Sequence, residues 1–168
     1  FFLKNKKKLD IFANEETTKY LLKSFNYCFN DNAGYPAIFN LNKLKQKQSF
    51  VSNGKSLSIE SITVKHGKIN SILYIINNLY AYVSDVSKIY EKDLNKLKNL
   101  KYLVVDCLRY DSHPSHYNLN DVLKLASKVK PKKTILTNMN NQIDYKKIQK
   151  YLPKNIIPAY DGMSFLIK

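Results

Sequence analysis

Short polar motifs follow several apolar segments of this 168-residue chain, and they contain the residues that could do chemistry. His66 precedes a glycine, Asp85 follows a serine, and residues 113–116 form a His-x-x-His motif. Imidazole and carboxylate groups are common metal ligands, and histidine is also the most frequent general acid or base. Each motif alone is more often a turn, a cap or a structural histidine. Because the motifs recur after strand-like segments, they favour one shared site at a sheet edge.

The segments that would position these motifs change in character along the chain. The first half is a series of strand-like segments, interrupted by a helix that Asn14 can cap. The later part alternates helical and strand-like segments, which indicates an α/β class and a single domain over 1–168. A hairpin is expected around Asn77 and Asn78. The expected strands are 9–12, 37–41, 50–51, 57–64, 71–76, 80–83, 102–105, 134–137, 156–157 and 163–167. The expected helices are 14–29, 91–100, 144–152 and one that Asn118 or Asn120 caps and that ends at Val129.

The charge of the chain is strongly positive, but its composition argues against a dedicated nucleic-acid interface. The net charge is +15, and Arg109 is the only arginine among 28 basic residues. Dedicated phosphate and base readers favour arginine, because its planar guanidinium binds in a bidentate manner. Lys, Asn, Ile and Tyr are abundant and share A/T-rich codons, so solvated lysine faces are the preferred interpretation.

The two cysteines and the lack of long apolar runs in the sequence indicate the cellular compartment. Cys28 and Cys107 match no zinc or disulfide spacing, so we expect buried free thiols in a reducing cytoplasm. No apolar run in the sequence approaches the roughly 20 residues of a membrane helix, and the N-terminus has no signal-peptide pattern. We therefore expect a cytoplasmic protein without a membrane partner.

The ordered set of motifs resembles bacterial metallo-β-lactamase-fold hydrolases. The subgroup is similar to phosphoribosyl cyclic phosphate phosphodiesterase and, more distantly, to ribonuclease Z. The resemblance implies a partial αββα metallo-β-lactamase sandwich. In that family an H-x-H-x-D-H loop precedes the point where this chain begins. We therefore expect the C-terminal two-thirds of the domain, a fragment that lacks its N-terminal part and is inactive alone. The matching segments are 66–74, 81–85, 105–109, 113–119, 135–139 and 158–163.

The same resemblance implies roles for individual residues. His66 matches the histidine that completes the first metal site, and Asp85 matches the aspartate that bridges two ions. His116, in preference to His113, matches a catalytic histidine near the leaving group. His66 and Asp85 should accordingly lie within about 5–6 Å of one another, as a shared metal requires.

The last ligand of the family is a histidine in the segment that begins at Thr137, and here that segment has none. Asn138 and Asn140 are the two candidates for this degenerate ligand position. The family uses two divalent ions, Zn or Mn, and the second site lacks its expected imidazole. An amide oxygen is a weaker donor to zinc, so we expect looser binding of the second ion and a relative preference for Mn²⁺.

The function implied for the full-length parent is metal-dependent hydrolysis of a small or cyclic phosphodiester by a metal-bound hydroxide. Its expected partner is a small-molecule phosphodiester, with RNA ranked second, and the sequence leaves room for a homodimer. The alternatives are a non-catalytic homologue, supported by the asparagines after Thr137, and a Lys-rich RNA-binding or RNA-processing protein.

Overall fold

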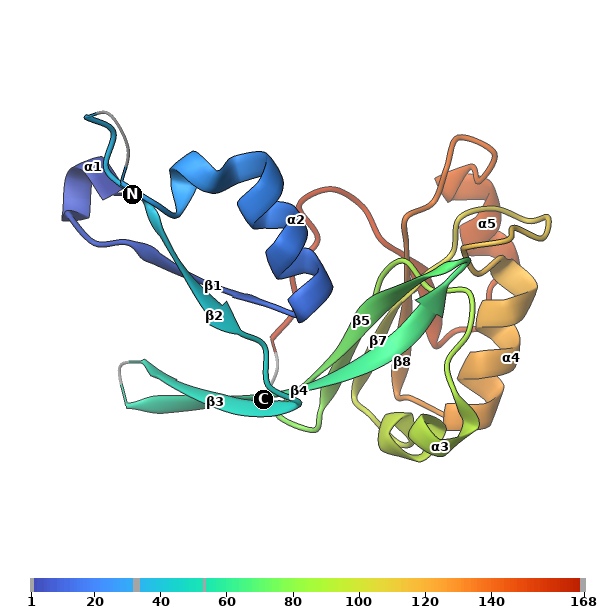
Figure 1. The fold of residues 1–168 in the computed structure, drawn as a ribbon. Coiled ribbons are helices and arrows are strands. Elements are labelled where there is room, and N and C mark those ends of the chain that lie inside the picture. Colours follow the sequence, from blue (N-terminus) through green and yellow to red (C-terminus); the bar gives the residue numbers. More distant parts are fainter. Residues whose placement is uncertain (1, 32–33, 53, 167–168) are drawn as a thin grey trace. The chain divides into compact units, whose positions relative to one another are not determined.

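The chain divides into two compact units, Phe1–Gln46 and Lys47–Lys168, each with its own sheet. A computed structural model describes residues 2–31, 34–52 and 54–166 (Figure 1). Helices and strands both contribute to the fold, as the expected α/β class requires. No helix in the described ranges is long and apolar enough to cross a membrane.

Unit 1 is a parallel pair of strands connected by a helix. β1 (Leu9–Ala13) and β2 (Phe39–Lys43) pair in parallel along their full lengths. α2 (Glu15–Phe25) joins them and begins after Asn14, whose side chain accepts a 2.8 Å hydrogen bond from the Thr17 amide. This bond satisfies one of the free amides of the first turn, so the predicted cap is confirmed. The remaining elements are α1 (Phe2–Asn5) and the 3₁₀ helix η1 (Asn26–Cys28).

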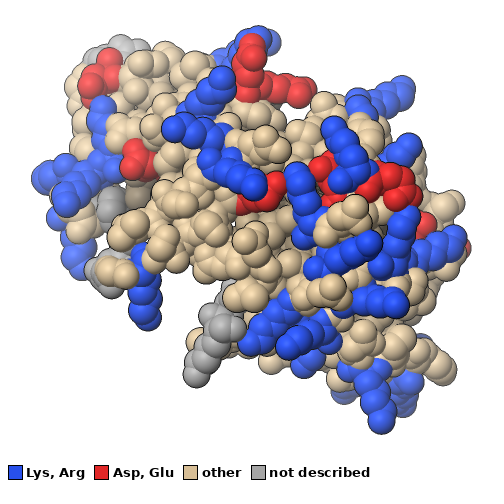
Figure 2. All heavy atoms as spheres, turned by 90° about the horizontal axis from the view of Figure 1, so that it is seen from below, with Lys and Arg blue, Asp and Glu red and all other residues tan. Residues whose placement is uncertain are grey.

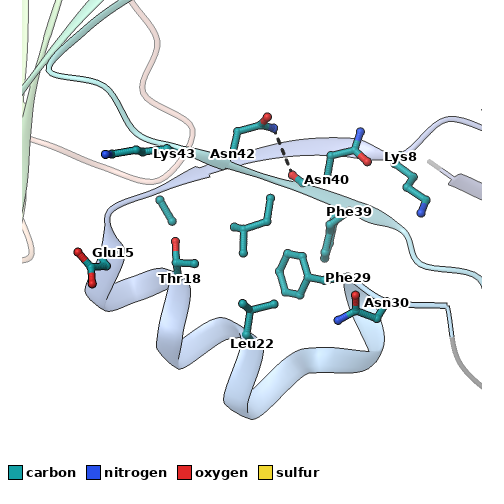
Figure 3. Close-up of a pocket in the computed structure, with 12 residues that line it drawn as sticks. Lys8, Glu15, Thr18, Leu22, Phe29, Asn30, Phe39, Asn40, Asn42 and Lys43 are labelled. Atoms are coloured by element: carbon teal, nitrogen blue, oxygen red, sulfur yellow. Dashed lines mark hydrogen bonds between the residues drawn. The ribbon is translucent and has the colours of Figure 1, made fainter.

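The helix in unit 1 is shorter than expected and has no buried face. α2 ends at Phe25 rather than Phe29, because the backbone tightens into η1, and none of its described residues is buried. A hollow of about 720 Å³ lies between α2 and the two strands (Figure 3). Leu22, Phe29 and Phe39 point into it, and the two phenylalanine rings lie 5.7 Å apart between their centroids.

Unit 2 contains a seven-stranded sheet that changes direction in its middle. β3 to β6 are antiparallel neighbours, whereas β6 to β9 run parallel. The predicted hairpin turn is confirmed: Asn77 and Asn78 have φ values of 51° and 54°, as a two-residue type I′ turn requires. The strands are β3 (Lys47–Ser52), β4 (Lys55–His66), β5 (Ile69–Ile76), β6 (Tyr80–Val83), β7 (Tyr102–Asp106), β8 (Lys133–Thr137) and β9 (Ile156–Pro158).

The parallel strands are joined by helices on one face of the sheet (Figure 1). α3 (Glu91–Leu94) and the 3₁₀ helix η2 (Asn95–Leu97) precede β7, α4 (Leu119–Val129) precedes β8, and α5 (Tyr145–Tyr151) precedes β9. Right-handed crossovers between sequential parallel strands place all of these helices on the same side. Their apolar residues form one core with the inward residues of β4 to β8.

Asn118, of the two predicted candidates, is the residue that caps α4. Its side chain accepts a 2.9 Å hydrogen bond from the Asp121 amide, and the Asp121 carboxylate accepts one from the Asn118 amide in return. This reciprocal capping box satisfies two amides that the helix cannot pair internally. It also fixes the chain just after His116, so the position of that histidine is tied to the helix.

Two expectations about elements in unit 2, and one about the cysteines, need correction. The helix expected over 91–100 ends early, because α3 tightens into η2 after Leu94 and the backbone becomes extended at Lys98; the Asn99 amide then bonds to the Val129 carbonyl. The strand expected over 163–167 is absent from its described part, residues 163–166, and residue 167 lies outside the described residues. There Phe165 instead stacks on Tyr102 with ring centroids 4.5 Å apart. Of the cysteines expected to be buried, Cys107 is buried and Cys28 is partly exposed.

Candidate metal centre

His66 is the last residue of β4, and its ring is oriented by a backbone carbonyl. Its Nδ1 atom lies 2.7 Å from the carbonyl oxygen of Ser115, so Nδ1 carries the proton and donates it. This leaves Nε2 as the nitrogen with a free lone pair. A histidine held by its other nitrogen in this way has the tautomer and orientation of a metal ligand.

A glycine makes the approach between His66 and the Ser115 loop sterically feasible. Gly67 has a φ of 60°, and a Cβ atom built on it would lie 2.9 Å from the Cβ atom of Ser115. Its amide also donates a 2.9 Å hydrogen bond to the Ser87 hydroxyl. A side chain at position 67 would therefore push the loop away from His66.

Asp85 lies in the loop that follows β6, with its carboxylate partly open to solvent. The residue has a φ of 53°, a left-handed conformation that aspartate tolerates better than most residues. The Ser84 hydroxyl donates a 3.1 Å hydrogen bond to Oδ2, and 51% of the Asp85 side chain is exposed. The carboxylate thus keeps lone pairs available for a cation.

His116 is oriented by a buried carboxylate. Its Nδ1 atom lies 2.7 Å from Oδ2 of Asp106, which is the last residue of β7 and has no solvent exposure. The Val86 amide donates a 3.1 Å hydrogen bond to the same oxygen. Burial raises the pKa of the Asp106 carboxyl, while these two hydrogen-bonding partners act in the opposite direction. The pair fixes His116 with its Nε2 atom directed away from Asp106.

The three side chains of His66, Asp85 and His116 converge at one edge of the sheet. One potential ligand atom from each lies within 4.8 Å of the others. The two imidazole rings meet edge to face, with centroids 4.6 Å apart. A transition metal with bonds of about 2 Å could be held by such nitrogen and oxygen donors, so the donor set fits a zinc-like or manganese-like ion. His66 and Asp85 therefore lie as close together as the sequence analysis expected; their ligand roles stay predictions.

The structure distinguishes between the two asparagines that could occupy the degenerate ligand position. Asn138 follows β8 with a φ of 58°, and its Nδ2 atom lies 3.5 Å from Oδ1 of Asp85. Asn140 instead accepts a 3.0 Å hydrogen bond on its side-chain oxygen from the Gln142 amide. Asn138 is therefore at the candidate centre, whereas the side chain of Asn140 is used within its own loop.

His113, the second histidine of the predicted motif, lies beside the group rather than within it. Its ring centroid is 5.1 Å from that of His116, and its Nδ1 atom lies 3.2 Å from the Ser115 hydroxyl. Partial desolvation and the nearby charge of Arg109 lower the pKa of His113. A neutral imidazole turned toward its own loop is better suited to shaping that loop than to binding the ion.

Asp106 is the functional residue whose partner the sequence analysis missed. A strand-end aspartate is usually a turn or cap former, so no contact with His116 was expected. A signal was nevertheless present, because the carboxylate directly follows the apolar strand Tyr102–Val105. A charged residue at the end of a fully buried strand requires a partner.

Comparisons with known proteins identify the family of the chain. The sequence profile described as the Beta-lactamase superfamily domain matches residues 2–139. The chain belongs to this family. No curated protein matches the sequence significantly.

Solved metallo-β-lactamase-fold structures share the architecture of the chain. A diphosphatase of the PhnP family is 24% identical, with a TM-score of 0.85, and the match covers 100% of this chain and 62% of that one. Human tRNase Z, short form, is 11% identical with a TM-score of 0.62 and coverages of 95% and 66%. Zn²⁺-bound PqqB from Methylobacterium extorquens is 10% identical, with a TM-score of 0.67 and coverages of 98% and 67%. The chain thus spans less than two thirds of the length of the first of these proteins, and the similarities establish the fold.

Proposed function

We propose that this chain forms part of a metal-dependent hydrolase that acts on a small or cyclic phosphodiester. The observation that carries the proposal is the convergence of His66, Asp85 and His116, with ligand atoms within 4.8 Å. Similarity to a diphosphatase and to a tRNase Z supports a phosphate ester as the substrate class. The three side chains come from three different segments, so the cluster is a product of the fold rather than of a local turn.

In this proposal His66 and Asp85 hold the ion. His66 offers Nε2, because its Nδ1 atom is bound to the Ser115 carbonyl, and Asp85 offers its solvent-facing carboxylate. When bound, a zinc or manganese ion lowers the pKa of water and polarises phosphate oxygens. Among the described residues this assignment gives the ion two ligands and leaves its other positions open, with His116 beside them. A second ion would need further ligands.

His116 acts in this proposal as the proton donor for the leaving oxygen. Its Nδ1 atom is engaged by Asp106, so a proton on Nε2 can be delivered to the departing alkoxide. Asp106 is a positioning residue, because it touches His116 and not the substrate site. A buried carboxylate behind a histidine holds the ring in one orientation and stabilises its charged form.

Metal titration of matched histidine variants tests this assignment. His66→Ala should abolish high-affinity binding of Zn²⁺ or Mn²⁺, measured by calorimetry, whereas His113→Ala should leave it within about twofold, since His113 is turned to its own loop. In the whole hydrolase of which this chain is proposed to form part, His116→Ala should lower turnover of a phosphodiester by about 100-fold or more while leaving the metal content intact. Loss of metal from His116→Ala would show that His116 is a ligand. Equal metal binding by wild type and His66→Ala would refute the proposed centre.

A non-catalytic homologue of the fold is a second candidate, and Asn138 is the observation that favours it. A neutral amide lies 3.5 Å from Asp85, where the resemblance implies a histidine ligand. Metal content separates the two readings: the enzyme binds at least one ion and hydrolyses a phosphodiester, and a non-catalytic homologue does neither.

RNA binding is a third candidate, favoured by lysines at the sheet edge opposite the candidate centre. This edge holds the start of β8 and the end of α4, and backbone hydrogen bonds join residues 99–101 to residues 129–133 there. Exposed lysines at this edge are Lys98, Lys130, Lys132, Lys133 and Lys154. Figure 2 shows many lysine side chains on the face seen from below. A steep loss of RNA affinity with rising salt, reduced by Lys132→Gln and Lys133→Gln, would support this reading; a flat salt dependence would dismiss it.

A further inference from the structure

A cavity of about 740 Å³ opens directly beside the candidate metal centre. Its walls come from the segments that follow β8 and β9, together with the first residue of α5. The carboxyl ends of neighbouring parallel strands lie at the same sheet edge, which is also the edge where Asp106 and His116 meet. The side chains that define it are Met139, Ile143, Tyr145, Tyr160, Asp161 and Met163.

Asn138 connects the cavity with the candidate metal centre. It lines the cavity, and its Nδ2 atom lies 3.5 Å from Oδ1 of Asp85. One ligand could therefore place a phosphate at His66, Asp85 and His116 while its attached group occupies the cavity. The size of the cavity falls within the range of about 300–1,000 Å³ that is usual for small-molecule sites.

The charge of the cavity indicates which end of such a ligand it can take. Among the described residues that line it, Asp161 is the one charged side chain, and no lysine or arginine is present. A phosphate would be repelled by this carboxylate and would gain no cation. The phosphate therefore belongs at the metal centre, and the cavity receives an uncharged group.

The walls of the cavity offer flat aromatic faces together with soft apolar groups. The rings of Tyr145 and Tyr160 meet at 89° with centroids 6.3 Å apart, and 58% of Tyr160 is exposed. Because much of Tyr160 is exposed, its ring is accessible to a planar ligand ring, and methionine side chains adapt to such rings. The Asp161 carboxylate can accept hydrogen bonds from hydroxyl or amino groups at the ring's edge.

We propose that this cavity binds the nucleoside part of a nucleotide substrate, with the base against Tyr160 and donors of the sugar or base on Asp161. The proposal rests on the proposed phosphodiester hydrolysis for the position of the phosphate. A pentose phosphate without a base would leave the exposed part of the Tyr160 ring uncovered. Stacking of one base on an aromatic side chain strengthens binding about 5- to 150-fold, which is enough to select a nucleotide over its base-free analogue.

Binding of uncharged adenosine tests the cavity without involving metal or hydrolysis. The chain contains no tryptophan, so quenching of tyrosine fluorescence reports on the binding, with calorimetry as a second readout. Tyr160→Ala should raise the Kd for adenosine about 10-fold, and Tyr160→Phe, which keeps the ring, should leave it nearly unchanged. Tyr151→Ala is the matched control, because Tyr151 is 86% exposed and does not line the cavity. If Tyr160→Ala loses its folded circular dichroism spectrum, Tyr145→Ala carries the same test.

Competition between base-containing and base-free ligands completes the test. Adenosine monophosphate should displace adenosine at least 10 times more effectively than ribose 5-phosphate, because only the first presents a base. Equal displacement by both, no binding of adenosine, or adenosine binding that is indifferent to Tyr160→Ala and Tyr145→Ala would overturn the proposal. If adenosine binds as expected but no phosphodiester is hydrolysed, the nucleoside site stands and the proposed hydrolysis fails.

Discussion

The Nδ1 atom of His116 lies 2.7 Å from Oδ2 of Asp106, a carboxylate without solvent exposure at the end of β7. Oδ2 of the same carboxylate also accepts the Val86 amide, from the loop that carries Asp85. One buried carboxylate therefore connects the loop that carries Asp85 with the loop that carries His116. Oδ1 has no hydrogen-bond partner among the described residues, so the contacts of this carboxylate rest on one oxygen.

Replacing Asp106 by asparagine should impair His116 without removing the metal. A neutral amide cannot serve as a charged acceptor for both the Val86 amide and His116 Nδ1. In the whole hydrolase of which this chain is proposed to form part, turnover of a phosphodiester should fall about 10- to 100-fold, with KM and metal content nearly unchanged. Asp111→Asn, in the exposed part of the same loop, is the control and should retain full turnover. A parallel loss of metal would place Asp106 in the ligand shell instead.

Gly67→Ala should destabilise the protein more than Gly54→Ala does. Both glycines have positive φ values, of 60° and 73°, but only position 67 faces a close neighbour, at 2.9 Å from its added Cβ. A left-handed backbone alone costs a non-glycine residue about 1–2 kcal/mol of stability. The Gly54 variant therefore measures this backbone cost without a steric clash. The steric clash at position 67 should add about 1–3 kcal/mol to the loss in unfolding free energy, measured in urea. Equal losses would mean that the Ser115 loop moves aside freely.

Asn138→His should strengthen metal binding, and Asn140→His should not. Asn138 faces Asp85 at 3.5 Å, and histidine also tolerates the left-handed backbone found there. We expect an affinity gain of about 10-fold for Zn²⁺ if an imidazole ligand is restored, measured by calorimetric titration. Asn140 is the internal control, because its side chain is bonded to the Gln142 amide. If neither variant changes affinity or stoichiometry, this segment does not reach the ion.

The protein should lose stability between about pH 10 and pH 12, in part through Tyr80. Burial, followed by the neighbouring Tyr82, raises the pKa of the Tyr80 hydroxyl from 10.0 to about 12. In this window the unfolded chain releases the proton and the folded chain retains it, so a rise in pH favours unfolding. Tyr80→Phe should flatten the fall of the melting temperature with pH, and Tyr151→Phe, at an exposed position, should not. Identical slopes for wild type and Tyr80→Phe would contradict the assignment.

Local sequence signals predicted much of the fold, because they act through neighbouring residues. Asn14 and Asn118 each bond to an amide three residues later, and Asn77 and Asn78 supply the left-handed turn between two strands. The helix after Tyr90 was predicted too long, because the chain becomes extended at Lys98, where the next amide, of Asn99, bonds to Val129 in a distant part of the chain. No local pattern encodes such a contact.

The candidate site likewise has one part that was predicted from the sequence and one part that depends on contacts between distant residues. The positions of His66 and Asp85 followed from strand ends that share one sheet edge. The pairing of His116 with Asp106 and the choice of Asn138 over Asn140 depend on how the loops fold back on each other. These arrangements are fixed by tertiary packing and by a single close approach at Gly67, and residue spacing says nothing about either.

The change from antiparallel to parallel pairing at β6 has a consequence for the order in which the protein acquires its structure. β3 to β6 pair through short hairpins and have little loop-closure entropy to overcome, whereas β7 to β9 wait for their crossover helices. His66 and Asp85 belong to the early part, and His116 and Asn138 to the late part. Both proposed metal ligands therefore belong to the part that pairs first, so a metal ion could bind before the crossover strands have docked. Such an ion would stabilise the transition state together with the native protein, and its main kinetic effect would be faster folding.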